Sequence, residues 1–216
     1  MIVVENWGLI EYRAAWERQR EYVRHIQQGV RQSTLVLCEH PAVITVGRAG
    51  TFRHVLCSPE ELAQRGIDLV ETDRGGDVTL HNPGQLVGYP IFDLMQFRAD
   101  LHWFVRTIEQ CIIDALKHWG IVAGQVPGLT GVWVEGQRKI CAIGIRCSRW
   151  VTSHGFALNV ANDLQQFDCI IPCGIPDREV TSMERELGTA VAVSEVASVV
   201  ADVFKVVFGR GHLQKP

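Results

Sequence analysis

The stretch "GVWVEGQRKICAIGIRC", residues 131–147, followed by "WVTSHGFALNV", residues 150–160, decides the fold. Both runs are dominated by apolar and β-branched residues, and a turn near Gly136 divides the first run into two strands. No helical pattern separates these strands, so they pair with one another directly. The sequence therefore predicts an α+β fold with a mixed, largely antiparallel sheet, and not the alternating strands and helices of a Rossmann series.

Further strands and four helices are predicted around this cluster. Short apolar runs at 34–40, 42–47, 67–72 and 85–94 are typical of strands. Helical patterns cover 11–30, 58–66, 100–120 and 194–209. In the first helix, one predicted apolar face consists of Tyr12, Trp16, Val23, Ile26 and Val30.

Local start and stop signals support two of these helices. Ser58 and Glu61 have the spacing of a capping box, with Gly66 at the end of the helix. Asp100 is placed to cap the third helix, and Gly120 to stop it.

The composition is that of a soluble globular protein. The chain has 216 residues, 47% of them hydrophobic, with a net charge of -3. This charge gives no reason to expect nucleic acid as a partner. No apolar run approaches the roughly 20 residues of a membrane span, and the N-terminus lacks an export signal. We therefore expect a cytoplasmic protein that does not bind membranes.

The seven cysteines lack metal-site spacing. In a cytoplasmic protein they are expected to be reduced thiols, mostly filling the core. Neither a metal ion nor a cofactor is predicted.

"RGGDVTLHNPGQLVGYP", residues 74–90, collects glycines, prolines, an arginine and a histidine in a run that otherwise favours strand. Gly75 and Gly76 allow close approach of another molecule to the backbone, and exposed N–H groups there can bind an oxygen. The alternative is a β-hairpin with a glycine-rich turn. The spacing is not that of a nucleotide-binding loop.

Two other residues stand out by their settings. Lys139 opens an apolar strand, where a buried amine costs free energy unless it has a partner or a task; the alternative is an edge lysine that reaches water. Cys173 lies between Pro172 and Gly174 in "IIPCGI", an unusual place for a core cysteine. A thiol at such a turn can face a pocket, where a nearby lysine would stabilise its thiolate.

Together these motifs resemble the octanoyltransferases of lipoic acid synthesis, the lipoyl(octanoyl) transferase family. The resemblance runs from about Thr34 to about Glu184 in three motifs, "RGGDVTLHNPGQLVGYP", "RKICAIGIRC…VTSHGFALNV" and "IIPCGI". It implies one catalytic domain over residues 1–216, with the fold of biotin and lipoate protein ligases.

The resemblance also implies the reaction and its partners. An octanoyl group moves from octanoyl-acyl carrier protein to a lysine of lipoyl domains, through a thioester on the enzyme, without ATP or metal. The acceptors would be the lipoyl domains of 2-oxoacid dehydrogenase E2 subunits and the glycine cleavage H protein.

The residues that match the family's motifs are expected to carry these roles. Cys173 would be the nucleophile and Lys139 its partner. Substrate contacts would fall on Arg74, Gly75, Gly76, Asp77, Val78, Thr79, Leu80, His81, Ala142, Ile143, Gly144, Gly155, Phe156 and Ala157. A side chain at Gly75 or Gly76 is expected to occupy space that the acyl chain needs.

Three other functions are alternatives. An ATP-dependent lipoate or biotin ligase of the same fold would need no nucleophilic cysteine, so Cys173 argues against it. A non-catalytic acyl-binding module would not need both Cys173 and Lys139. A thioesterase would use water in place of the acceptor lysine.

Overall fold

The computed structural model describes residues 2–172 and 178–209. Its strands are β1 (Val3–Leu9), β2 (Thr34–Glu39), β3 (Val43–Val46), β4 (Asp68–Glu71), β5 (Val78–His81), β6 (Gln85–Ile91), β7 (Ala123–Val126), β8 (Leu129–Val134), β9 (Arg138–Ser148), β10 (Val151–Asn159) and β11 (Glu179–Val180). Its α-helices are α1 (Tyr12–Gln27), α2 (Pro59–Gln64), α3 (Leu101–Leu116), α4 (Met183–Leu187) and α5 (Val193–Gly209). Short 3-10 helices occupy Phe52–His54, Leu94–Gln96, Lys117–Trp119 and Leu164–Cys169.

The strands form two sheets. The large sheet has the order β1-β2-β6-β10-β9-β8-β7, with β11 added beside β9, and the small sheet has the order β4-β3-β5. The pairs β1–β2, β3–β4 and β11–β9 are parallel. The other pairs are antiparallel. The predicted α+β fold with a mixed, largely antiparallel sheet is confirmed.

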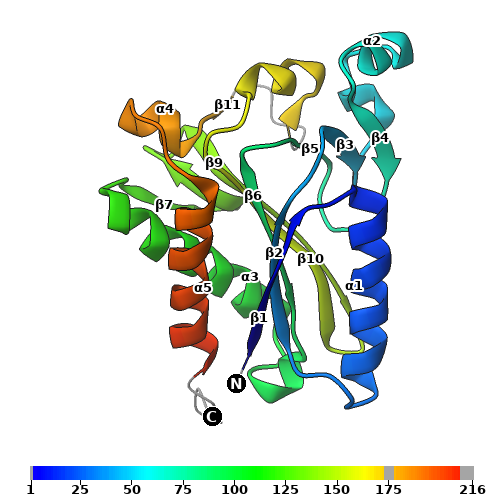
Figure 1. Ribbon diagram of the computed structural model, residues 1–216, viewed down its shortest axis with the longest axis vertical. Coiled ribbons are helices and arrows are strands. Elements are labelled where there is room, and N and C mark those ends of the chain that lie inside the picture. The colour runs from blue at the N-terminus through cyan, green and yellow to red at the C-terminus, as the bar shows by residue number, and fades with distance from the viewer. Residues whose placement is uncertain (1, 173–177, 210–216) are drawn as a thin grey trace.

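The large sheet is covered on both faces (Figure 1). Helices α3 and α5 pack on one face and α1 on the other. Strand β2 shows the alternation that this requires, because Leu35 and Leu37 join the core under α3 and α5 while Val36 joins the core under α1.

Aromatic residues dominate the core between α3, α5 and the sheet. Phe92, Phe104, Phe204 and Phe208 are buried with their rings in contact. Each such side chain contributes about 1.5–3 kcal/mol on burial. This core fixes the sheet from one side, so the side chains on its other face are held at fixed positions.

The local helix signals are confirmed, with one error. Ser58 and Glu61 form the capping box at the start of α2, and the side chain of Asp100 accepts from the Trp103 N–H at the start of α3. Val30 does not belong to the apolar face of α1, since it is 72% exposed. The helix ends before it, where Gly29 adopts a φ of 75°.

The expectation that the cysteines are reduced is wrong for one pair. Cys57 and Cys169 form a disulfide bond across 112 residues of sequence. The small-sheet core brings the two residues together, and nothing in their local sequence indicates this pairing. Cys38, Cys111 and Cys141 are buried thiols, as predicted, whereas Cys147 is half-buried.

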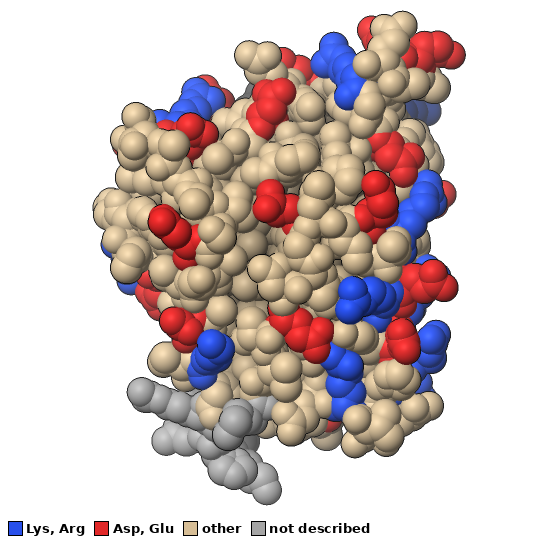
Figure 2. Space-filling view, in the orientation of Figure 1, with Lys and Arg blue, Asp and Glu red and all other residues tan. Residues whose placement is uncertain are grey.

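The surface mixes both signs of charge. On the face drawn in Figure 2, acidic side chains are scattered, and Lys and Arg gather mainly along the side of α1. None of the helices in the described part of the chain is long and apolar enough to cross a membrane.

Candidate active site

A cavity of about 210 Å³ contains most of the predicted substrate-binding residues. It is smaller than the roughly 300–1,000 Å³ of sites for drug-sized ligands, so it suits a short chain. Its lining consists of Tyr12, Arg74, Gly76, Asp77, Thr79, His81, Val87, Tyr89, Gly128, Leu129, Thr130, Lys139, Ala142, Ile143, Gly144, His154, Gly155, Phe156 and Ala157.

Small residues on neighbouring strands leave room for this cavity. Ala142 of β9 lies opposite Ala157 of β10, and Gly144 lies opposite Gly155. Gly155 also allows a close backbone approach, because a Cβ there would overlap the Gly88 carbonyl oxygen. The cavity is therefore a consequence of which residues the strand register brings side by side.

Three predicted contact residues do not line the cavity. Val78 and Leu80 lie in the core under the small sheet, because side chains along a strand alternate and only Thr79 and His81 face the cavity. Gly75 instead donates its N–H to the Ile145 carbonyl at 3.2 Å.

The glycines of the Arg74 loop serve a close backbone approach. A Cβ at Gly75 would lie 2.8 Å from the Ile145 carbonyl oxygen, and a Cβ at Gly144 would lie 2.6 Å from the Gly75 carbonyl oxygen. At Gly75 the obstacle to a side chain is thus the backbone of β9 rather than an acyl chain. Gly76 does line the cavity, and its φ of 86° also favours glycine.

Arg74 fixes this loop from within. Its guanidinium donates to the carbonyl oxygens of Thr45 and Asp77, both at 2.6 Å, and to that of Gly75 at 3.0 Å. The side chain is buried. Arg74 thus both lines the cavity and holds its glycine-rich wall in shape.

Lys139 lies where two cavities adjoin. Its side chain is only 7% exposed, and its Nζ is 4.6 Å from the centre of the Trp133 ring. Thr79, Lys139, Ala142 and Ala157 line both the main cavity and a second, smaller one, which Pro172 also lines. Cys173, which follows Pro172 in sequence, lies outside the described residues.

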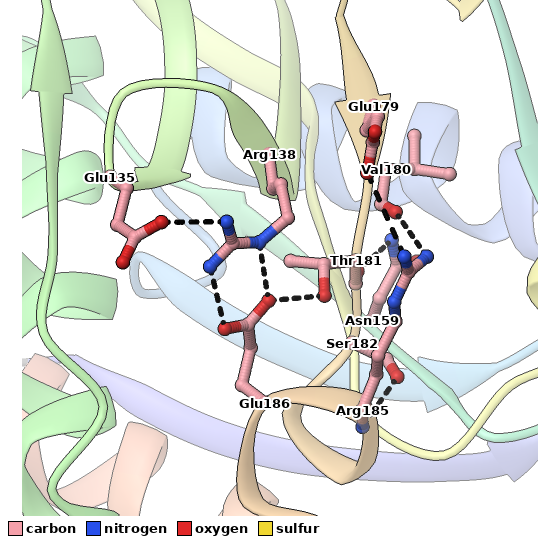
Figure 3. A network of polar contacts seen from close by, with 9 residues as sticks. All are labelled: Glu135, Arg138, Asn159, Glu179, Val180, Thr181, Ser182, Arg185 and Glu186. Atoms are coloured by element: carbon pink, nitrogen blue, oxygen red, sulfur yellow. Dashed lines mark hydrogen bonds and ion pairs between the residues drawn. The ribbon is translucent and has the colours of Figure 1, made fainter.

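Figure 3 shows a polar network around Arg138 and Glu186. Arg138 forms a bidentate ion pair with Glu186, at 2.9 and 3.0 Å, and Glu186 also accepts from the Thr181 hydroxyl at 2.6 Å. The Thr181 N–H donates to the Lys139 carbonyl at 2.9 Å. The Arg138 guanidinium holds the pKa of Glu186 below its ordinary value. The network ties α4 and β11 to the start of β9.

Buried aromatic and imidazole rings form another part of the site. His81 bonds to the Gln85 side chain at 2.8 Å and stacks on Tyr12, and His40 bonds to the Tyr89 hydroxyl at 2.6 Å. Burial lowers the pKa of His81 to about 3 and the pKa of His40 to about 4. Both imidazoles are therefore neutral near pH 7.

The sequence patterns missed several lining residues. Tyr12 was expected only as part of an apolar helix face, and Leu129 and Thr130 had no distinguishing signal. His154, like His81, follows a run of strand-forming residues, but no role was inferred from this signal. In the described residues, no three or more His, Cys, Asp or Glu side chains cluster as metal ligands would.

The sequence matches the family described as the lipoyl protein ligase A/B catalytic domain over residues 11–205. The chain belongs to this family. Octanoyltransferases are among its curated relatives. That of Chloroflexus aurantiacus is 52% identical over 198 residues, with 91% of this chain and 89% of the relative covered.

Two further relatives extend this match. The octanoyltransferase of Koribacter versatilis is 50% identical over 212 residues, covering 96% of this chain and 84% of the relative. The octanoyltransferase of Cytophaga hutchinsonii is 46% identical over 213 residues, covering 90% of this chain and 87% of the relative. The resemblance to octanoyltransferases drawn from the three motifs is confirmed.

Solved structures share the fold at low identity. LipL1 of P. falciparum in complex with lipoate matches with a TM-score of 0.78 and 12% identity over 100% of this chain and 65% of that one. Ta0514 of T. acidophilum, a putative lipoate protein ligase by its description, matches with a TM-score of 0.73 and 15% identity, covering 97% of this chain and 86% of that one. The biotin protein ligase of Aquifex aeolicus matches with a TM-score of 0.53 and 12% identity, covering 97% of this chain and 69% of that one. The expected ligase-like fold is confirmed.

Proposed function

We propose that this chain transfers an octanoyl group from octanoyl-acyl carrier protein to a lipoyl-domain lysine, through a thioester on Cys173. The chain is an acyltransferase of lipoate biosynthesis, as relatives at 46–52% identity indicate. One observation carries the finer proposal. The buried Lys139 lies between an acyl-sized cavity and the small cavity lined by Pro172, the residue before Cys173.

The main cavity is proposed as the acyl site. Val87, Leu129, Ile143 and Phe156 give it apolar walls, and Ala142, Gly144 and Ala157 leave it open. Each methylene buried there contributes about 0.8 kcal/mol. Arg74, Gly76, Asp77, Thr79, His81 and Gly155 are the other predicted contacts at this site.

In the first step, the Cys173 sulfur attacks the thioester carbonyl. The carrier-protein thiolate leaves and takes up a proton, so one thioester replaces another at nearly equal free energy. An ordinary thiol has a pKa of about 8.5 and is only a few per cent ionised at pH 7. Lys139 raises the thiolate fraction, either as a cation beside the thiol or by accepting its proton.

In the second step, the amine of the acceptor lysine attacks the carbonyl of acyl-Cys173. The Cys173 sulfur leaves, and the proton released by the amine returns to the Lys139–Cys173 pair. Because an amide replaces a thioester, this step is downhill. Neither ATP nor a metal ion has a role in either step.

The expected setting of the reaction follows from the same proposal. The acceptors are the lipoyl domains of 2-oxoacid dehydrogenase E2 subunits and the glycine cleavage H protein. The structure of a T. acidophilum lipoate protein ligase with its E2 lipoyl domain, which shares this fold, supports such a pairing. We further propose that residues 1–216 act as one catalytic domain in the cytoplasm.

Mass analysis tests this function. The protein is incubated with octanoyl-acyl carrier protein, and its peptides are mapped for an octanoyl adduct. An adduct on the peptide that contains Cys173, chased onto a lipoyl domain, is the expected result. An adduct on Cys147, which is a free thiol, would instead refute Cys173 as the nucleophile. Labelling only from free octanoate with ATP would indicate a ligase, and octanoate release without a lipoyl domain would indicate a thioesterase.

A further inference from the structure

The cavity runs along β9 and β10, and its two ends differ. One end lies at Lys139, Ala142 and Ala157, where the small cavity adjoins. Farther along the strand pair, Gly144 lies opposite Gly155 and Ile145 lies opposite His154. His154 is therefore the lining residue of β10 most distant from the Lys139 end.

The end at His154 is closed by tight contacts. There the Gly75 N–H donates to the Ile145 carbonyl, and a Cβ at Gly75 would lie 2.8 Å from that oxygen, so the loop and β9 are in backbone contact. The His154 imidazole is 2% exposed, and its Nε2 donates to Asp73 at 2.6 Å. Beyond the ring, Asp73 also bonds to Trp16 and Arg146, and these three residues line a separate cavity of about 410 Å³, where charged groups face any longer chain.

The backbone conformation and burial of His154 cost free energy. It has a φ of 56°, in the left-handed region, in the middle of a strand. Its Nδ1 is buried without a hydrogen-bond partner among the described residues. Backbone outliers of this kind cost about 1–3 kcal/mol and cluster at functional sites. The cost points to a role for the imidazole beyond packing.

We infer that His154 is the end wall of the acyl site and sets the longest acyl chain that the site accepts. The inference rests on the proposed function and specifies its substrate. Burial lowers the pKa of His154 although the Asp73 carboxylate opposes this shift. A neutral ring is a suitable surface for the terminal methyl of an alkyl chain.

The dimensions fit an octanoyl chain. The three steps along β9 from Ala142 to Ile145 span about 10 Å, at roughly 3.3 Å per step. An extended octanoyl chain, with carbon–carbon bonds of about 1.5 Å in zigzag, spans about 9 Å. With its carbonyl at the Lys139 end, such a chain places its methyl group at His154.

Direct binding of straight-chain carboxylates tests the wall without using the acyl transfer reaction. Dissociation constants of hexanoate, octanoate, decanoate and dodecanoate are measured calorimetrically for the wild type, for His154→Gly and for Arg149→Gly. Glycine tolerates the left-handed φ at both sites, and Arg149, with a φ of 50° in the turn between β9 and β10, is the matched control.

For the wild type and Arg149→Gly, affinity should rise about fourfold per methylene up to octanoate and fall at decanoate. In His154→Gly, the vacated ring space should admit a further ethylene unit, so that decanoate binds about 16-fold tighter than octanoate. Dodecanoate should still bind weakly because of Asp73 and Arg146.

Unchanged chain-length preference in His154→Gly would overturn the end-wall role while leaving the acyl site intact. If the wild type binds none of the four carboxylates, the acyl site itself is wrong and the wall with it. If His154→Gly does not fold, His154→Asn, which also tolerates a left-handed φ, must show the same shift in a smaller degree, or the inference fails.

Discussion

The amino group of Lys139 lies 4.6 Å from the centre of the Trp133 ring, and both side chains are buried. The Thr181 N–H also donates a hydrogen bond to the backbone carbonyl of Lys139. Lys139 is thus fixed at both its backbone and the end of its side chain, as a group that acts on a reacting atom must be.

Replacing Lys139 by alanine should leave the fold intact and reduce octanoyl transfer by about 10²–10⁴-fold, the usual contribution of acid–base catalysis. Transfer to a lipoyl domain is measured by mass spectrometry, and folding by circular dichroism. Lys205→Ala is the control, because Lys205 is exposed and its ion pair among the described residues is with Asp202 on α5. Near-normal turnover by Lys139→Ala would remove Lys139 from the mechanism.

Gly144→Val should displace the Arg74 loop, because its Cβ alone would lie 2.6 Å from the Gly75 carbonyl oxygen. We expect weaker octanoate binding and a loss of about 1–3 kcal/mol of stability in urea unfolding. Gly124→Val on β7 is the matched control, since a Cβ there would meet no atom of residues 2–172 and 178–209 within 4 Å. Equal effects of the two substitutions would show that the contact between Gly75 and Gly144 has no special role.

Glu186→Gln should cost about 1–3 kcal/mol of stability, because it breaks a charged hydrogen-bond pair with Arg138. The side chain of Glu186 is 15% exposed. Glu179 pairs with Arg185 at 3.6 Å and is 68% exposed, so Glu179→Gln should cost less than about 1 kcal/mol. Urea unfolding at pH 7 measures both.

The same ion pair predicts a pH dependence. The pKa of Glu186 is lowered in the folded state, chiefly by Arg138. The ion pair therefore stabilises the folded protein fully above the ordinary glutamate pKa of about 4.3, and this stabilisation is lost as the pH falls through the lower pKa of the folded state. Below about pH 4, the stability difference between wild type and Glu186→Gln should therefore shrink. A difference that stays constant into strong acid would contradict this account.

The buried histidines predict a second pH window. The pKa values of His81 and His40 lie at about 3 and about 4 in the folded state, against about 6.5 when unfolded. Between these values the unfolded chain binds more protons, so stability should fall as pH drops below about 6.5. Each histidine contributes a slope of about 1.4 kcal/mol per pH unit.

His81→Gln should remove one such contribution from the slope of unfolding free energy against pH, measured between pH 6 and pH 5 or so. His118→Gln, at an exposed position of the 3-10 helix after α3, is the matched control substitution. Equal slopes for wild type and His81→Gln would mean that His81 is not buried in its neutral form.

Local chemistry alone determined much of the fold. The capping box of Ser58 and Glu61, the Asp100 cap and the glycine stops act within one helical turn, so their signals lie in a few adjacent residues. The strand cluster of residues 131–160 likewise identified the α+β class, because successive strands pair through short turns. The edge strand β1 and the short helix α4 were missed, since their pairing and packing partners are distant in sequence.

The sequence by itself also marked the segments that form the candidate site, through glycine pairs and a lysine in an apolar strand. Only the tertiary structure decided which residues of those segments face the cavity. Val78 and Leu80 belong to a core because side chains alternate along a strand. Tyr12 lines the cavity because α1 packs beside it, and His154 lines it in a left-handed backbone conformation within β10. The disulfide of Cys57 with Cys169 depends on the same long-range packing. Contacts between residues far apart in the chain form when elements bury apolar surface against one another, and a pattern of neighbouring residues cannot predict which elements will meet.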